Sequence, residues 1–194
     1  MRFIVGTDNR GGSVTAQGGG KSDPRDANYN VDPSYRYTKI TRTLSERDGA
    51  GEGQIAVTLE TSSEFVGYRK ETLDCSALAF RSNGTITLPK DRSARALGVV
   101  QDSVALGVRI EQAGRVHLKA SVVSDMDIAE IRLEGPSFET PIRIYDEHDE
   151  TLDITKPGDY ILRGAYQLAV RLPNTSLGGR PISVEMEATL SPVT

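Results

Sequence analysis

The chain has 194 residues and a formal net charge of −4, from 23 basic and 27 acidic side chains. This length fits one domain with an appendage or one large β-domain, and 37% hydrophobic residues are enough for a sizeable core. The acidic balance gives no broad basic field, so we expect neither nucleic acid nor a membrane as a partner.

The single cysteine, Cys75, cannot form an internal disulfide. Lone cysteines are more often small buried hydrophobic residues than nucleophiles, and we expect burial here. The N-terminal Met-Arg-Phe-Ile-Val-Gly has too few apolar residues for a signal peptide or a membrane span. We therefore expect the chain to stay in the compartment where it is translated.

The first part of the chain is rich in residues that favour turns. Residues 6–34 hold six glycines, two prolines and many Asn, Asp and Ser residues, with few apolar side chains spaced to line a core. We expect an extended, irregular N-terminal arm over residues 1–34 and a β-sandwich domain over residues 35–194. Residues 6–34 have three basic and four acidic side chains, so this segment differs from the basic arms that hold nucleic acid.

The remainder of the chain shows the period-two alternation of half-buried strands. Residues 104–110 and 116–122 alternate on either side of Gln112-Ala-Gly114, which predicts a hairpin with one buried face. Further alternating runs cover residues 55–59, 129–133, 142–144, 152–154, 160–172 and 182–190. The run 160–172 is long for one strand, and we expect it to bend near Gly164. A strand bent in this way can cross from one sheet to the other.

The segment before this long run, Ile154-Thr-Lys-Pro-Gly-Asp-Tyr160, resembles the tyrosine corner of Greek-key sandwiches. In that motif a tyrosine hydroxyl ties down the connection that leads into its strand. With no confident helix, the pattern predicts an all-β, antiparallel β-sandwich of the Greek-key or jelly-roll kind.

A phosphate-binding loop is a tempting interpretation of Gly18-Gly-Gly-Lys-Ser22. The full motif needs a glycine at position 15, where this chain has Thr15, and it needs a strand just before and a helix just after. Pro24 follows within two residues of Ser22, so we do not expect a nucleotide site.

Acidic side chains cluster in residues 146–150, Asp-Glu-His-Asp-Glu, with Asp153 beyond them. Oxygen and imidazole ligands could suit calcium or a transition metal, but the spacing matches no calcium loop. An acidic hairpin turn is the plainer explanation, and the same holds for Asp125, Asp127 and Glu130. We expect no bound metal or cofactor, while a cation at 146–153 stays an open alternative.

Acid-base or nucleophilic catalysis usually uses histidine, and the chain has only His117 and His148. His117 shares its parity with Arg115 and Lys119, which predicts a place on the polar face of its sheet. No Gly-x-Ser-x-Gly motif and no Cys-x-x-Cys pair occurs. We therefore assign no catalytic residue, although paired carboxylates could come together only in space.

The clustered aromatic residues are Tyr29, Tyr35 and Tyr37, and they are the candidates for subunit contacts. The first functional hypothesis is a non-enzymatic structural subunit of a large assembly, such as a phage or virus cement, decoration, minor capsid or tail protein assembled in the host cytoplasm. Its partners would be other protein subunits, including copies of itself. The second is a surface adhesin or pilus subunit whose residues 2–5 complete a neighbour's sheet. The third is a ligand-binding or hydrolytic sandwich.

Overall fold

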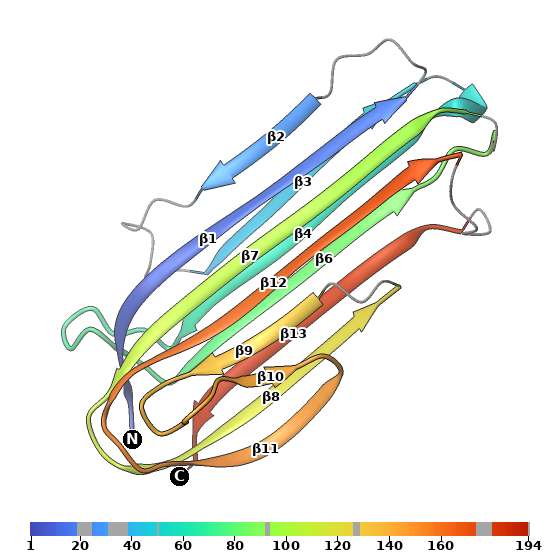
Figure 1. Cartoon of the computed structure of the whole chain (residues 1–194). Coiled ribbons are helices and arrows are strands. Elements are labelled where there is room, and N and C mark those ends of the chain that lie inside the picture. Colours follow the sequence, from blue (N-terminus) through green and yellow to red (C-terminus); the bar gives the residue numbers. More distant parts are fainter. Residues whose placement is uncertain are drawn as a thin grey trace.

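A computed structural model describes residues 1–18, 25–30, 39–49, 51–91, 94–125, 129–173 and 180–193. Within these ranges, two antiparallel sheets pack face to face, as Figure 1 shows. Their inward-facing side chains form one continuous apolar core. The predicted all-β antiparallel sandwich is confirmed. Among the described residues no helix is long and apolar enough to cross a membrane.

Sheet A runs in the order β10-β9-β12-β7-β1-β2, with β5 pairing to the start of β1. Its strands are β1 (Phe3–Gly18), β2 (Arg25–Asn30), β5 (Asp74–Cys75), β7 (Ala96–Ile110), β9 (Ala129–Glu134), β10 (Ile142–Ile144) and β12 (Gly158–Leu172). Sheet B runs in the order β11-β8-β13-β6-β4-β3. Its strands are β3 (Ile40–Asp48), β4 (Ile55–Val66), β6 (Ala77–Thr87), β8 (Gly114–Ser124), β11 (Glu147–Ile154) and β13 (Ile182–Pro192), and a short 3-10 turn, Gly51–Gly53, precedes β4.

The C-terminal strands insert between earlier ones. β12 lies between β7 and β9, and β13 lies between β6 and β8. Each sheet is therefore completed by pairing between residues that are far apart in sequence, such as Leu172 with Ala96 and Leu190 with Leu78.

The predicted irregular arm is wrong for residues 3–18 and 25–30. Phe3–Gly18 is a long strand between β7 and β2, paired with β7 almost to its end, and Arg25–Asn30 continues the sheet beyond it. The prediction failed because polar residues occupy inward positions of β1. Asp8 and Arg10 are buried there and neutralise each other, with two hydrogen bonds of 2.6 and 2.8 Å from the guanidinium to the carboxylate.

A β-bulge in β1 also interrupts the alternation by which a strand is predicted from sequence. The register with β7 shifts between Val5 and Asp8, so the buried positions change from Phe3 to the even-numbered residues that include Val14 and Ala16. The bulge also packs Thr7 against Gly107 of β7, where an added Cβ would lie 2.1 Å from the threonine hydroxyl. A side chain at position 107 would therefore force Thr7 to shift.

The start of β1 is fixed by an ion-pair cluster. The Asp74 carboxylate accepts hydrogen bonds of 2.8 and 2.6 Å from Arg69, and Arg2 Nε lies 2.8 Å from Asp74 Oδ1. The Arg69 guanidinium, assisted by Arg2, holds the pKa of Asp74 well below its usual range. The carboxylate therefore stays charged and ties β5 to the first residues of the chain.

The predicted hairpin of residues 104–110 and 116–122 is also wrong. Both segments are strands, but β7 belongs to sheet A and β8 to sheet B. Their connection passes from one sheet to the other. Alternation shows which face of a strand is buried, and both strands bury a face against the same core, so the pattern fits either arrangement.

The predicted tyrosine corner is confirmed. Tyr160 is fully buried, and its hydroxyl donates a 2.5 Å hydrogen bond to the Lys156 carbonyl oxygen. The Ser137 hydroxyl lies 2.5 Å from the Tyr160 hydroxyl. It also accepts hydrogen bonds of 2.9 Å from the backbone N–H groups of Thr155 and Lys156. Tyr160 thus fixes the entry into β12.

Residues 160–172 do not cross from one sheet to the other. β12 keeps an unbroken register with β7 from Gly158 to Leu172 and stays in sheet A. Gly164 lies where the two sheets pack closely. A Cβ at this position would lie 2.5 Å from Cζ of Phe80, which packs onto β12 from sheet B.

Gly164→Ala should therefore lower the free energy of unfolding by about 1–3 kcal/mol, because the added methyl group overpacks the core. Urea unfolding measures this change. Adding Phe80→Leu, which shortens the facing ring, should recover part of the loss relative to Phe80→Leu alone. An unchanged stability in Gly164→Ala would show that the two sheets do not meet at this point.

Candidate interaction surface

The outer face of sheet A changes character where β9 ends. β9 pairs with β12 only from Ile161 to Tyr166. Beyond that point the sheet consists of β12, β7, β1 and β2. Alternation with the buried positions places one set of β1, β7 and β12 residues on the outer face, and we call this set the distal face. It comprises Gly11, Thr15, Gln17, Leu97, Val99, Gln101, Ser103, Ala165, Gln167, Ala169 and Arg171.

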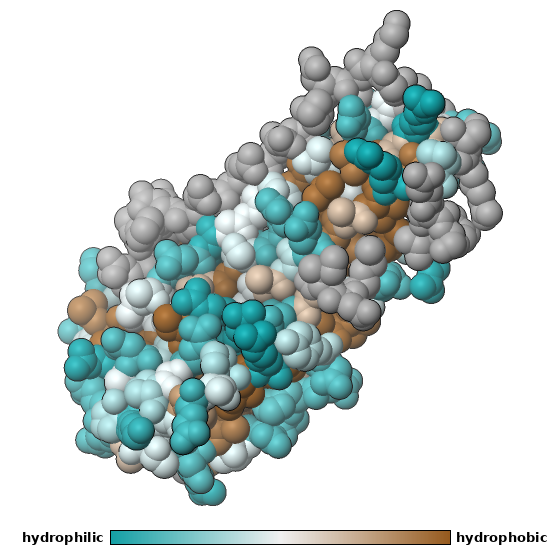
Figure 2. Space-filling view, viewed as in Figure 1, coloured by the Kyte–Doolittle hydropathy of each residue, from teal (hydrophilic) through white to brown (hydrophobic). Residues whose placement is uncertain are grey.

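Only Arg171 is charged among the residues of the distal face. Its other members are small, amide, hydroxyl or aliphatic side chains. Figure 2 shows apolar surface gathered over the upper parts of β7 and β12. Burying such a face against a partner removes few charges from water, so the desolvation cost of association is small.

Charged side chains concentrate elsewhere. The outer face of sheet B carries the ion pair of Arg81 with Glu185 and a 3.1 Å contact of His117 with Asp149. On sheet A, the charges lie near β9, where Glu130 pairs with Arg132. The Arg132 guanidinium holds the pKa of Glu130 below its ordinary value. The distal face is thus set apart from both charged regions.

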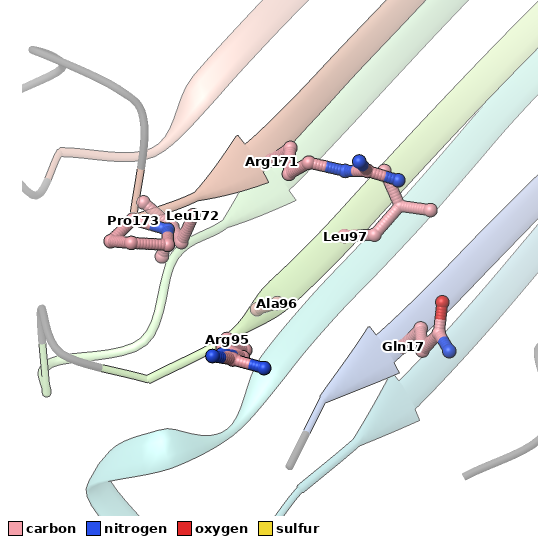
Figure 3. Close-up of a pocket in the computed structure, with 7 residues that line it drawn as sticks. All are labelled: Gln17, Arg95, Ala96, Leu97, Arg171, Leu172 and Pro173. Atoms are coloured by element: carbon pink, nitrogen blue, oxygen red, sulfur yellow. The ribbon is translucent and has the colours of Figure 1, made fainter. Parts of the chain in front are cut away.

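A shallow hollow of about 290 Å³ lies at the end of the distal face. Strand register sets Gln17, Leu97 and Arg171 side by side across β1, β7 and β12. Figure 3 shows the Arg171 side chain extending from β12 toward Leu97, with Arg95 just before the start of β7. Arg171 and Arg95 form no ion pair with a carboxylate in the part of the chain that the structure describes. This end of the face therefore offers two guanidinium groups to a partner.

Of the three tyrosines predicted as contacts, the structure describes the position of Tyr29 alone. Tyr29 lies in β2, opposite Gly12 of β1. Tyr35 and Tyr37 lie outside the described residues, as do residues 19–22 of the glycine-lysine-serine segment. Their part in subunit contacts stays a prediction. The distal face itself was not found from the sequence, because only strand register brings its residues together.

The acidic segment 146–150 is not a simple turn. The turn is short, and β11 begins at Glu147, so most of the segment pairs with β8. His148 Nε2 lies 3.6 Å from Glu150 Oε2. The predicted position of His117 on the polar face is confirmed. Among the described residues, no three His, Cys, Asp or Glu side chains gather as a metal site would require.

In the second acidic group, Asp125, Asp127 and Glu130, the two described residues form contacts that stabilise the fold. Asp125 accepts a 2.8 Å hydrogen bond from the Ser183 backbone N–H and lies 3.0 Å from Arg180. These contacts hold the end of β8 to the start of β13. Glu130 is paired on β9, and Asp127 lies outside the described residues.

A polar cluster inside the sandwich was not predicted from the sequence. Ser82 of sheet B donates a 2.6 Å hydrogen bond to Asp102 Oδ2 of sheet A, and the Tyr166 hydroxyl lies 3.2 Å from Ser82 Oγ. All three residues are buried. Their signal in the sequence is a polar residue at an inward position between apolar ones, as in Val100, Asp102, Val104. Satisfied buried networks favour one packing of two layers over its alternatives.

Cys75 is fully buried, as expected. Burial raises the pKa of its thiol to about 12, although the nearby Arg2 opposes the shift. A nucleophilic cysteine needs a lowered pKa and access to solvent. Cys75 therefore acts as a core side chain of β5.

We expect a disulfide reagent to modify Cys75 at least about 100-fold more slowly in the native protein than in urea, because the thiolate is both rare and enclosed. Absorbance of the released thiol measures the rate. Fast stoichiometric modification of native protein would contradict the burial of this residue.

Comparisons with known proteins assign no family. No protein-family model matches the chain, and no curated protein matches its sequence. Among solved structures, the GH31 alpha-xylosidase from Xanthomonas citri aligns with 93% of this chain at 9% identity, with a TM-score of 0.24. The chain spans 28% of the length of that enzyme. A likeness this weak carries no argument about activity.

Proposed function

We propose that this protein is a non-enzymatic structural subunit of a large protein assembly that contacts its neighbours through the distal face. A phage or virus particle is the setting we favour, with the chain as a cement, decoration, minor capsid or tail component of the virion. The observation that carries the proposal is the nearly uncharged outer surface at the distal end of a sandwich whose other outer surfaces are charged.

The rigidity of the sandwich supports this proposal. Contact residues held in the strands of a packed sheet lose little conformational freedom when a partner binds, which lowers the cost of association. The distal face lies on β1, β7 and β12, three adjacent strands of sheet A. Arg95 and Arg171 add positive charge at its end, which favours a carboxylate on the neighbour and fixes its orientation.

The adhesin or pilus alternative has less support in its expected form. Donor-strand exchange by residues 2–5 requires that segment to be free. Phe3 pairs with Cys75 of β5, and Val5 pairs with Val108 of β7. The segment is therefore already part of its own sheet.

Surface hollows give little support to a hydrolytic sandwich. No carboxylate is among the described residues that line the hollow beside Arg171 or a second hollow, of about 420 Å³, beside Asn9 and Arg163. The described lining of a third hollow, of about 260 Å³ on sheet B, has one carboxylate, Glu60, together with Arg81. Glycoside cleavage commonly needs two carboxyl groups facing one another across the substrate.

The proposal is tested by placing a charge in the distal face. Val99 lies at its centre, between Thr15 and Ala169. Val99→Glu should weaken assembly at least about tenfold, because a carboxylate would have to be buried at the contact. Sedimentation velocity of the full chain over a concentration series measures the effect.

The matched control is Thr58→Glu, a partly exposed strand residue on the outer face of sheet B. It should leave assembly unchanged. Equal effects of the two substitutions, or a wild-type chain that stays monomeric at every concentration, would contradict the proposal. Deleting residues 1–34 cannot replace this test, because it removes β1 from sheet A.

A further inference from the structure

The distal part of β12 is an open sheet edge in the described structure. β7 pairs with β12 along its whole length, from Gly158 to Leu172. On the opposite side, β9 reaches only to Tyr166, so residues 167–172 have no strand neighbour there among the described residues. The outer-face side chains of this stretch, Gln167, Ala169 and Arg171, are all exposed. An edge strand presents unpaired backbone N–H and C=O groups that another strand can use.

Three other edge strands, β10, β11 and β3, have the usual protection against strand addition. β10 has three residues, which is too short to recruit a partner strand. β11 carries four carboxylates in eight residues, and β3 ends with Glu-Arg-Asp. Charges and short strands discourage pairing at an edge. Residues 167–172, Gln-Leu-Ala-Val-Arg-Leu, have one charge and strong alternation, so this edge is the least protected of these.

We propose that residues 167–171 pair in antiparallel fashion with the same residues of a second copy, about a twofold axis, so that sheet A continues from one subunit into the next. The inference rests on the proposed function and deepens it by naming the first partner. It also joins the distal faces of two copies into one continuous surface.

The segment is complementary to itself in one register. With Ala169 opposite its own copy, Gln167 lies opposite the partner's Arg171, and the amide oxygen can accept a hydrogen bond from the guanidinium. No like charges then face each other, and Leu168 lies opposite the partner's Val170 on the core side. Directly opposite residues of antiparallel strands contact each other, so this match favours a second copy over an unrelated strand.

A designed disulfide tests this register directly. The Cβ atoms of directly opposite residues are about 4.5–5.5 Å apart, close to the reach of a disulfide. Ala169→Cys in the full chain should therefore give a covalent dimer under mild oxidation. Cys75 contributes no background, because it is fully buried.

The matched control is Ala165→Cys, an exposed outer-face residue of the same strand that pairs with Glu130 of β9. In the proposed dimer the two copies of residue 165 lie far apart, so this variant should stay uncrosslinked. Equal crosslinking of both variants, or none in Ala169→Cys, would overturn the proposal.

Ala169→Lys provides the non-covalent test, because it sets two positive charges opposite each other at the twofold axis. The dissociation constant of the dimer should rise by about tenfold, whereas Ala165→Lys should leave it unchanged. An assembly that Val99→Glu disrupts but Ala169→Lys does not, without crosslinking at residue 169, would overturn edge pairing alone. A chain that stays monomeric in every variant would overturn both this inference and the proposed function.

Discussion

The pairing of β1 with β7 is the constraint on which the rest of the sandwich depends. β7 lies at the centre of sheet A, with β12 on one side and β1 on the other. β2 and β5 join the sheet only through β1. The distal face also needs β1, since Thr15 and Gln17 form its border. A glycine-rich N-terminus is thus a structural centre rather than an appendage.

The two sheets are held in one arrangement by polar and steric contacts as well as by apolar burial. The Ser82–Asp102 hydrogen bond joins sheet B to sheet A, and Phe80 fits against Gly164, where no Cβ intervenes. Apolar side chains alone tolerate small shifts between layers, whereas these contacts do not. The fixed position of the sheets keeps the β12 edge and the distal face in constant geometry, which a repeated subunit contact requires.

Local pattern predicted much of this fold. Alternation located residues 129–133 and 182–190, and the tyrosine corner at Tyr160 was recognised from its short motif. β1 was not predicted, because a bulge reverses its alternation and because polar residues such as the buried Asp8 and Arg10 are typical of loops. The sheet to which β8 belongs was also not predicted, since alternation carries no information on which strands pair. The candidate surface could not be predicted, because residues 17, 97 and 171 meet only through strand register.

The most direct test of this account is amide hydrogen exchange at Val14 and Ala16 of β1, compared with Val100 of β7. Strands that share the centre of a sheet open only in global unfolding, so the account predicts equal, high protection at these positions. Rapid exchange at Val14 and Ala16 beside a protected Val100 would show that the N-terminal segment is an arm after all. The distal face, which includes residues of β1, and the continuous sheet proposed to join two subunits would then no longer be supported.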